Sequence, residues 1–297
     1  MSNRVVGTNV LEPEGPVCTT EGLVYLVEMA KARVCISAID SQGERTEIGR
    51  VGGRPNGLTI DGDGNLWIAG GENETLVRMA PDGRILDQFV GPAGDPYLWP
   101  NDLVFGSNGL LYLTDSGILP DDFIDGQSIR EDYATCPYHG RVFEIDPRTG
   151  DVLRILDTGL KFTNGIAFDE SDRLYVNETI SGNVYRYDIF SDREPRRELF
   201  GNVIAEFDKG FLGPDGMAFG DDGKLYCAVF GQGDITVLDT NGAVSDRLKT
   251  NGMRPTNIAF RHEGQSAVVT DLGLCELEEL TMPCGGLALN APGITQD

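Results

Sequence analysis

The chain has 297 residues and a formal net charge of -23, because 47 Asp and Glu stand against 24 Lys and Arg. So acidic a chain offers little of the cationic surface that nucleic acids and anionic membranes require, and we expect neither as a partner. The N-terminus has no apolar signal-peptide core, and no stretch approaches the roughly 20 apolar residues of a membrane span. The sequence therefore predicts a soluble, cytoplasmic protein and leaves its oligomeric state open.

The turn-forming residues and the cysteines favour a fold of many short strands. The 39 glycines and 15 prolines are spread along the chain, as expected when strands are joined by tight turns. A chain of this length does not need disulfides to fold, and its six cysteines include no CxxC pair. We expect them to be reduced and mostly buried, although Cys275 and Cys284 are close enough in sequence to pair.

One phrase recurs six times along the chain: a polar residue opens an alternating apolar strand, and a glycine turn leads into a second apolar strand. The opening residues are Glu14, Asn56, Asn101, Asn164, Asp215 and Thr256. They follow one another at intervals of 41 to 63 residues, and four-stranded propeller blades repeat about every 40 to 50 residues. The sequence predicts an all-β fold, a six-bladed β-propeller with four antiparallel strands per blade, as one domain over residues 1–297.

The second copy shows how the strands of a unit follow one another. Its first two strands are expected over residues 55–60 and 64–68. The third is expected over 75–80, before the turn Pro81-Asp82-Gly83, and the fourth over 84–89. Alternating β-branched and aromatic residues closed by such turns are typical of antiparallel meanders.

The third copy contains an insertion of 24 residues, Ser116 to His139, between its second and third strands. Its mixed apolar and charged composition predicts a lid over the mouth of the channel. The alternative is a solvated loop without a role.

The two ends of the chain are expected to complete one blade together. The sixth copy has a third strand near residues 275–280 but then only a tail over 285–289. A run from Val5 to Leu11 precedes the first copy and has no blade of its own. We predict that this run supplies the missing outer strand and closes the ring.

The six opening residues carry the chemistry of the sequence. The first strand of each propeller blade lies nearest the axis, so these six side chains should meet at one mouth of the central channel. Asn and Asp also open strands simply by capping turns, which remains an alternative at any single position. Turn capping does not require six polar groups packed around one axis, where unpaired groups are costly. Two carboxylates with amide oxygens would hold a hard divalent cation such as calcium or magnesium.

Taken in order, these phrases resemble the senescence marker protein, gluconolactonase and luciferin-regenerating enzyme family over nearly the whole chain. The phrases that carry the resemblance are Glu14-Gly15-Pro16-Val17, Pro55-Asn56-Gly57-Leu58, Pro100-Asn101-Asp102-Leu103-Val104 with Tyr112-Leu113-Thr114-Asp115, Asn164-Gly165-Ile166-Ala167, Pro214-Asp215-Gly216-Met217-Ala218 and Arg254-Pro255-Thr256-Asn257.

The resemblance implies a six-bladed propeller with one catalytic divalent cation, expected to be calcium, with zinc, magnesium and manganese as alternatives. It implies that Glu14, Asn164 and Asp215 hold the ion. The expected activity is metal-dependent hydrolysis of a small-molecule lactone, in which the cation polarises the carbonyl group and Asp215 acts as base or nucleophile. Substrate contacts are expected from Asn101, Asn56 and Trp99.

Two departures from the family pattern bear on the substrate. Family members that act on sugar lactones often carry an Arg just before the Pro-Asn-Asp phrase, where this chain has Asp95-Pro96-Tyr97-Leu98-Trp99. A ligand less polar than an aldonolactone is therefore favoured. The Pro that usually follows Thr-Asp is also absent, since Ser116 stands after Asp115.

Rival functions stay open on the sequence. Similar propellers hydrolyse organophosphate triesters with the same cation arrangement, and a metal-stabilised propeller that binds a ligand without turning it over is equally compatible with the fold. A Ser-His-Asp triad is not indicated, because the chain has no Gly-x-Ser-x-Gly phrase and neither His139 nor His262 has a partner by spacing. Both histidines are more typical of surface turns.

Overall fold

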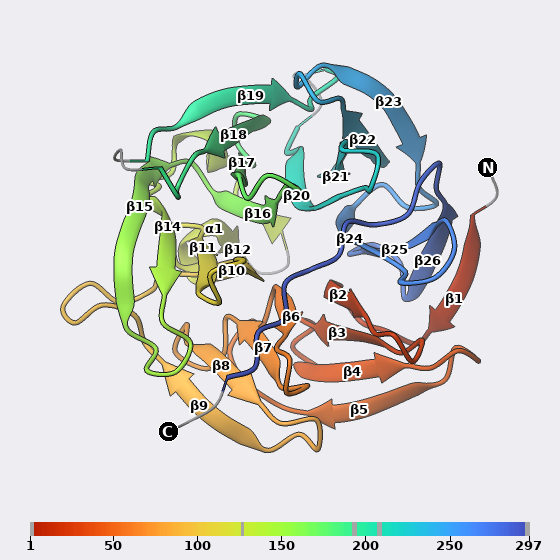
Figure 1. The fold of residues 1–297 in the computed structure, drawn as a ribbon, viewed down its shortest axis with the longest axis horizontal. Helices are drawn as coiled ribbons and strands as arrows, with labels where there is room; N and C mark the ends of the chain where they lie inside the picture. Colours follow the sequence, from red (N-terminus) through yellow and green to blue (C-terminus); the bar gives the residue numbers. More distant parts are fainter. Residues whose placement is uncertain (1–2, 126–127, 192–194, 207–209, 295–297) are drawn as a thin grey trace.

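The structure is a computed structural model that describes residues 3–125, 128–191, 195–206 and 210–294. Within these ranges the strands form six antiparallel sheets of four strands each, arranged as blades around a central axis (Figure 1). A further two-stranded ribbon lies in the insertion of the third blade. The predicted six-bladed propeller is confirmed.

The first three blades run from the innermost to the outermost strand. Blade 1 contains β2 (Pro13–Cys18), β3 (Val24–Glu28), β4 (Cys35–Ile39) and β5 (Arg45–Gly49). Blade 2 contains β6 (Leu58–Ile60), β7 (Leu66–Ala69), β8 (Leu76–Met79) and β9 (Ile85–Phe89). Blade 3 contains β10 (Pro100–Phe105), β11 (Leu111–Asp115), β14 (Gly140–Ile145) and β15 (Val152–Leu160).

The last three blades complete the ring. Blade 4 contains β16 (Thr163–Phe168), β17 (Leu174–Glu178), β18 (Asn183–Tyr187) and β19 (Glu198–Asn202). Blade 5 contains β20 (Gly213–Phe219), β21 (Leu225–Phe230), β22 (Asp234–Leu238) and β23 (Val244–Lys249). Blade 6 contains β24 (Pro255–Phe260), β25 (Ser266–Asp271), β26 (Glu276–Thr281) and β1 (Arg4–Thr8).

The ring is closed by the N-terminal strand, as predicted. β1 pairs antiparallel with β26, from Arg4 opposite Glu279 to Thr8 opposite Glu276. The guanidinium of Arg4 also donates to the Glu279 carboxylate at 2.9 Å. The outermost strand of blade 6 therefore comes from the opposite end of the chain to its other three strands (Figure 1).

Neighbouring blades are held together by buried apolar side chains. The cluster between blades 2 and 3 shows the pattern: Trp67 packs edge-on against Phe105 with ring centroids 5.9 Å apart, and it stacks on Phe89 at 6.2 Å. A corresponding apolar cluster lies between each pair of adjacent blades in the described residues. Burial of these faces fixes the angle between blades and thereby the position of the inner strands.

Glycines in the repeated phrase allow the inner strands to approach one another. A Cβ at Gly165 would stand 2.3 Å from the carbonyl oxygen of Asp215, and one at Gly216 would stand 1.9 Å from the Asn257 side chain. A larger residue would therefore push the next inner strand away from the axis. This explains why glycine directly follows the polar residue in several copies.

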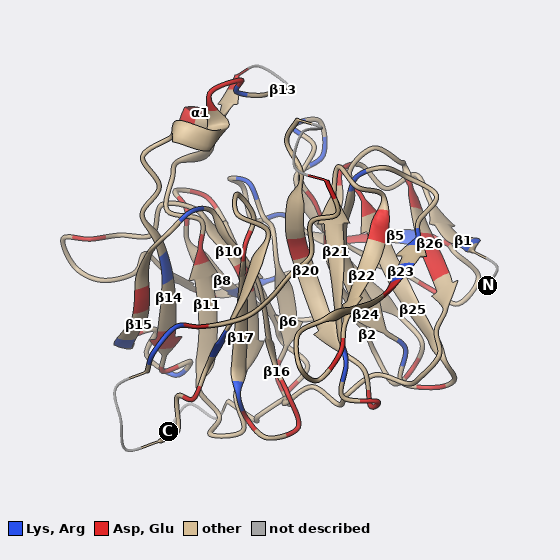
Figure 2. Ribbon diagram, turned by 90° about the horizontal axis from the view of Figure 1, so that it is seen from above, with Lys and Arg blue, Asp and Glu red and all other residues tan. Residues whose placement is uncertain are grey.

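The two faces of the ring are covered by different segments (Figure 2). On one face lies the insertion of blade 3, which contains α1 (Pro120–Phe123), β12 (Ile124–Asp125), β13 (Ser128–Ile129) and the 3-10 turn η1 (Tyr133–Thr135). The prediction that it lies between the second and third strands is confirmed, because it joins β11 to β14.

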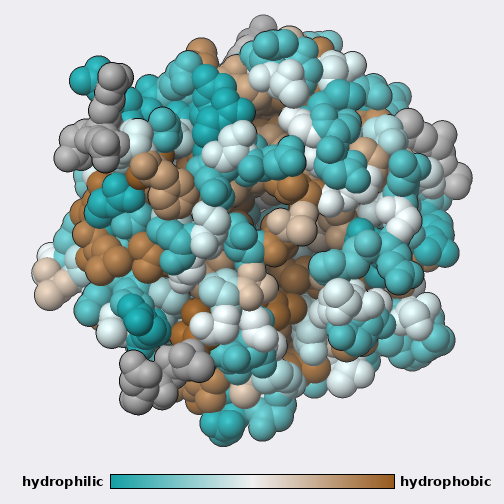
Figure 3. All heavy atoms as spheres, in the orientation of Figure 1, coloured by the Kyte–Doolittle hydropathy of each residue, from teal (hydrophilic) through white to brown (hydrophobic). Residues whose placement is uncertain are grey.

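The C-terminal tail crosses the opposite face and was not anticipated from the sequence. Leu287 N donates to Phe219 O at 2.9 Å, Gly62 N donates to Pro292 O at 2.8 Å, and the Ile294 side chain is buried in the cluster between blades 2 and 3. Beneath the tail lies a cavity of about 400 Å³, lined in part by Asp102. Figure 3 shows this face, with hydrophobic side chains around the hollow near its centre.

The cysteines and histidines lie as the sequence suggests. All six cysteines fall within the described ranges and are free, so Cys275 and Cys284 do not pair. Four of the six are buried. His139 and His262 are both exposed. In the part of the chain that the structure describes, no helix has the length and apolar character needed to cross a membrane.

Candidate functional site

The residues predicted to form the site lie around one pocket of about 100 Å³ at the lid end of the channel. Its lining includes all seven side chains singled out in the sequence: Glu14, Asn56, Trp99, Asn101, Asn164, Asp215 and Thr256. Glu14 and Thr256, which are 242 positions apart in the chain, are thus brought together. Their individual roles as metal ligands or substrate contacts stay predictions.

A local irregularity of the inner strands turns these side chains toward the axis. In β2 the pairing register shifts between Glu14 and Val17, and in β20 it shifts between Pro214 and Met217. Comparable shifts occur at the start of β10, β16 and β24. A bulge bends its strand and re-aims a side chain, so the repeated phrase encodes both the strand and the break that exposes its polar residue.

Hydrogen bonds from neighbouring elements orient the two amides. Asn101 Nδ2 donates to Ser116 Oγ at 2.9 Å, while Asn101 Oδ1 is buried without a hydrogen-bond partner in the described structure. Asn164 Nδ2 donates to Thr179 Oγ1 at 3.2 Å, and that hydroxyl donates in turn to Pro214 O at 2.8 Å. The amide nitrogens are thereby fixed against the protein, and an unpaired acceptor remains in the pocket.

The carboxylates of the channel are buried close to one another. Burial raises the pKa of Glu14 well above its usual value, and the charges of Asp215 and Asp102 raise it further. Burial likewise raises the pKa of Asp215, with a further contribution from Asp102, while a hydrogen bond from Asn164 opposes the shift. Burial also raises the pKa of Asp102 to about 7. Such shifts indicate negative charge that the surroundings do not compensate.

This donor set fits a hard divalent cation. The described residues contain no group of three or more His, Cys, Asp and Glu side chains placed to hold a metal ion, so the two carboxylates would need amide oxygens beside them. Asn101 Oδ1 is an unpaired acceptor in the same pocket, and Asn164 lines it too. Carboxylate and amide oxygens are the ligands that calcium and magnesium prefer, and their two charges balance one such ion.

The insertion covers this pocket, as predicted. Phe123, Ile124 and Ile129 all belong to the pocket lining. Phe123 packs against Phe162 and Phe211 with ring centroids 4.7 and 5.6 Å apart. The walls above the polar floor are therefore strongly apolar, which shields the carboxylates from water.

Asp102 was overlooked as a candidate because it follows the residue on which the sequence argument rested. It is 8% exposed and lines the cavity beneath the C-terminal tail, not the lid-side pocket. Leu103 N donates to Asp102 Oδ1 at 2.9 Å. Its presence in the Pro-Asn-Asp phrase of one copy only was the available signal.

An acidic residue that ends the second strand of four blades was also overlooked in the sequence: Glu28, Asp115, Glu178 and Asp271. Each accepts a hydrogen bond from a backbone N–H that lies shortly before the inner strand of its own blade. Asp115 binds the N–H groups of Leu98 and Trp99 at 2.9 Å and pairs with the buried Arg141 at 2.7 Å. It therefore fixes the backbone that carries Trp99 at the pocket. The repeated acidic position was visible in the sequence.

Comparison with known sequences finds a gluconolactonase and a lactonase among the proteins that this chain resembles. The family model described as "SMP-30/Gluconolactonase/LRE-like region" matches residues 89–271. The gluconolactonase of Zymomonas mobilis is 28% identical over 226 residues, which cover 72% of this chain and 60% of that protein. Lactonase drp35 of Staphylococcus epidermidis is 25% identical over 237 residues, covering 78% of this chain and 67% of that protein. The chain thus aligns with about 60% of the length of the Zymomonas protein.

Solved structures show the same fold at low sequence identity. A luciferin-regenerating enzyme superposes with a TM-score of 0.79 at 16% identity, covering 98% of this chain and 99% of that one. A calcium-binding protein, regucalcin, from Agrobacterium tumefaciens gives a TM-score of 0.75 at 17% identity, covering 99% and 98%. These similarities show a shared propeller fold, and the chemistry of the pocket depends on the residues that line it.

Proposed function

Because the chain belongs to the SMP-30/gluconolactonase/LRE-like family, we propose that it is a metal-dependent lactone hydrolase whose catalytic centre is the pocket around Glu14, Asn164 and Asp215. One observation carries the proposal: oxygen donors from separate blades converge on one buried pocket in which two carboxylates lie close together. Lactone hydrolysis by the curated relatives supports the choice of reaction.

The proposed ion is calcium, held by Glu14, Asn164 and Asp215, with Asn101 as a neighbouring oxygen donor. Bound there, it would supply positive charge next to the lactone carbonyl oxygen, where negative charge develops during hydrolysis. The preference for calcium over zinc follows from a donor set of oxygens without imidazole or thiolate.

The residues of the chain account for the remaining steps. Water attacks the carbonyl carbon of the ring ester, the bond to the ring oxygen breaks, and the product is a hydroxy acid. The Asp215 carboxylate accepts the proton of the attacking water and can return it to the departing ring oxygen. In the alternative mechanism an Asp215 oxygen attacks the carbonyl carbon itself, the bond to the ring oxygen breaks, and the ring oxygen takes up a proton from water to give a mixed anhydride with Asp215. Water then attacks the Asp215 carboxyl carbon and releases the hydroxy acid, so a single turnover in ¹⁸O-water would label Asp215. Phe123 and Ile129 exclude bulk water from the reaction.

The test follows proton release from a panel of lactones that differ in ring size and substituents. Protein stripped with a chelator should be inactive, and addition of calcium should restore the rate. Asp215→Asn should lower kcat by about 100-fold or more, since a positioned base contributes about 10² to 10⁴ in rate. Asp82→Asn, at an exposed turn, is the matched control and should keep the wild-type rate.

Different results would point to different functions. Proton release unaffected by the chelator and by Asp215→Asn would remove the catalytic assignment. Hydrolysis of phosphotriesters but of no lactone would favour the organophosphatase alternative. Calcium-dependent ligand binding without turnover of any ester would favour a binding protein.

A further inference from the structure

Two hydrogen-bond donors at the lid-side pocket have no acceptor. In the described structure, Arg54 Nε and Trp99 Nε1 are both buried and lack a hydrogen-bond partner. Both side chains line the same pocket, and Trp99 is only 4% exposed. The guanidinium carbon of Arg54 lies 5.9 Å from the centre of the Trp99 ring. Buried donors of this kind are costly unless a ligand accepts from them.

The two residues occupy equivalent positions in adjacent blades. Arg54 stands two residues before Asn56 in blade 2, and Trp99 stands two residues before Asn101 in blade 3. The same position in blade 4 holds Phe162, whose ring contacts that of Trp99 with centroids 5.4 Å apart. These side chains therefore form a continuous arc above the polar floor, with a cation at one end and aromatic rings along the rest.

The positive charge of Arg54 is poorly neutralised by the protein. Its guanidinium lies 3.8 Å from a carboxylate oxygen of Glu12, and the Glu12 side chain is 41% exposed. An ion pair so long and so open to water contributes little. Burial lowers the pKa of Arg54, and the charge of Glu12 opposes that shift. The pocket thus contains a guanidinium short of a counter-ion.

The charges of the loaded site would favour an anionic ligand. Glu14 and Asp215 together balance one divalent cation, so the charge of Arg54 is left over in the pocket. The charge of Asp102 acts on Glu14 and Asp215, whereas Glu12 is the carboxylate whose charge acts on Arg54.

We propose that Arg54 and Trp99 bind a carboxylate on the substrate, so that the chain acts on lactones with an apolar body and one acidic group. This inference rests on the proposed function, because it concerns the substrate of the same pocket. Arg54 pairs with the carboxylate, and Trp99 Nε1 donates a further hydrogen bond to it. The apolar body packs against Phe123 and Phe162.

The kinetic test compares two lactones that differ in charge alone: a phenyl-substituted five-membered lactone carrying a carboxylate, and its carboxamide. Arg54→Gln should raise KM for the acid by at least about 30-fold, since breaking a buried ion pair costs about 2 to 5 kcal/mol. KM for the carboxamide should change by less than about 3-fold, and kcat for either substrate should change little. Arg54→Lys should restore part of the affinity, because it keeps the charge but not the planar donors.

A smaller effect is expected from Trp99→Phe, which removes the indole N–H and keeps an aromatic ring. Arg84→Gln is the matched control, because the same change is made at a side chain that is 68% exposed. The proposal would be overturned if Arg54→Gln weakened acid and carboxamide equally, or if the wild-type protein did not prefer the acid.

A binding measurement separates this inference from the proposed activity. The lactam analogue of the acid, which resists hydrolysis, should bind calcium-loaded wild-type protein in calorimetry and should bind Arg54→Gln at least about 30-fold more weakly. If no lactone is hydrolysed but this difference in binding is found, the subsite stands and the hydrolase proposal falls. If lactones are hydrolysed but the lactam binds both proteins equally, the subsite falls and the hydrolase proposal stands.

Discussion

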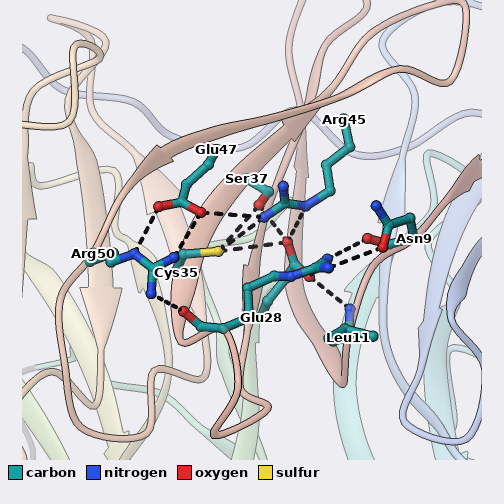
Figure 4. A network of polar contacts seen from close by, with 9 residues as sticks. Asn9, Leu11, Glu28, Cys35, Ser37, Arg45, Glu47 and Arg50 are labelled. Carbon is teal, nitrogen blue, oxygen red and sulfur yellow. Dashed lines mark hydrogen bonds and ion pairs between the residues drawn. The ribbon is translucent and has the colours of Figure 1, made fainter.

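Two buried glutamates of the first blade, Glu28 and Glu14, have opposite surroundings. Glu28 ends β3 and is surrounded by donors (Figure 4): Ser37 Oγ at 2.5 Å, Leu11 N at 2.7 Å, Arg33 at 2.8 Å and Arg45 Nε at 2.5 Å. Although burial raises its pKa, these hydrogen bonds together hold the pKa of Glu28 below its usual value.

Glu14, on the adjacent strand, accepts hydrogen bonds from the Asn257 amide and the Gly15 backbone, and two other carboxylates lie near it. Its pKa is raised by burial and by the charges of Asp215 and Asp102. Glu28, which joins β3 to its neighbours, is thus neutralised by two arginines. In the described part of the chain, the channel carboxylates Glu14, Asp215 and Asp102 lie near one another without such a positive partner. We infer that the missing positive charge at the channel comes from solution, as a bound cation.

The largest expected effect is at the compensated glutamate. Glu28→Gln should destabilise the protein by about 3 to 5 kcal/mol, because it leaves Arg33 and Arg45 without their buried counter-ion. Glu14→Gln, measured in chelator at pH 8, should be neutral or stabilising, because it removes a carboxyl group whose charged form is disfavoured by burial and by the charges of Asp215 and Asp102. Urea unfolding followed by tryptophan fluorescence measures both. Equal losses from the two changes would remove the distinction between the two regions.

The two regions should also respond oppositely to pH. The folded-state pKa of Glu28 is lowered, so its contribution to stability is present above the unfolded pKa and is lost as pH falls through the folded value. The folded-state pKa of Asp102 is raised to about 7 from 3.8, so stability is lost as pH rises between these values. The shift of about 3 units corresponds to at most about 4 kcal/mol.

Unfolding curves in chelator from pH 4 to pH 9 measure this contrast. Asp102→Asn should reduce the decline between pH 4 and pH 7 and leave the part that the raised pKa values of Glu14 and Asp215 cause, whereas Glu28→Gln should leave the whole decline in place. A decline of the same size in Asp102→Asn would show that another group causes it.

A cation should abolish much of the difference between the two regions. Calcium at 100 times its dissociation constant should stabilise the wild-type protein by about 2.7 kcal/mol, since it binds the folded state. Glu14→Gln and Asp215→Asn should lose most of this gain, whereas Glu28→Gln should keep it on a lower baseline. Thermal unfolding with and without calcium measures the gain. An undiminished gain in Glu14→Gln and Asp215→Asn would place the ion elsewhere.

The fold was largely predictable because it is encoded locally and repeatedly. Each copy of the phrase contains its own alternation, turn and opening polar residue, so six copies define six blades, and the run from Val5 to Leu11 had to pair with the incomplete sixth copy. The tail was not predictable in this way. Its course depends on single contacts, such as the burial of Ile294 in the core between blades 2 and 3. Such contacts leave no periodic pattern in the sequence.

The part of the site formed by equivalent positions of the repeat was predictable from the sequence. The part formed by side chains outside these positions was not. Glu14, Asn164 and Asp215 share a position in the repeat, so symmetry brings them together. Arg54 escaped notice because it precedes a Pro-Asn turn, and its neighbour Trp99 lies 45 residues further along the chain. The partners of Glu28 escaped notice too, because Arg33 reaches it from the turn before β4 and Arg45 from the start of β5.

The smallest effect is expected within the Glu28 network itself. Ser37 Oγ donates to Glu28 Oε1 at 2.5 Å, and both side chains are fully buried. Ser37→Ala should cost about 1.5 kcal/mol, the lower end for a hydrogen bond to a charged group, because Arg33 and Arg45 remain to hold the carboxylate. The pKa of Glu28 should rise, because the Ser37 hydrogen bond is the largest of the hydrogen bonds that lower it. In urea unfolding between pH 3 and pH 6, the loss of stability should therefore begin at a higher pH than in the wild-type protein. A cost as large as that of Glu28→Gln would mean that the hydroxyl, and not the arginine pair, keeps this carboxylate charged, and the contrast with the channel would then rest on hydrogen bonding alone.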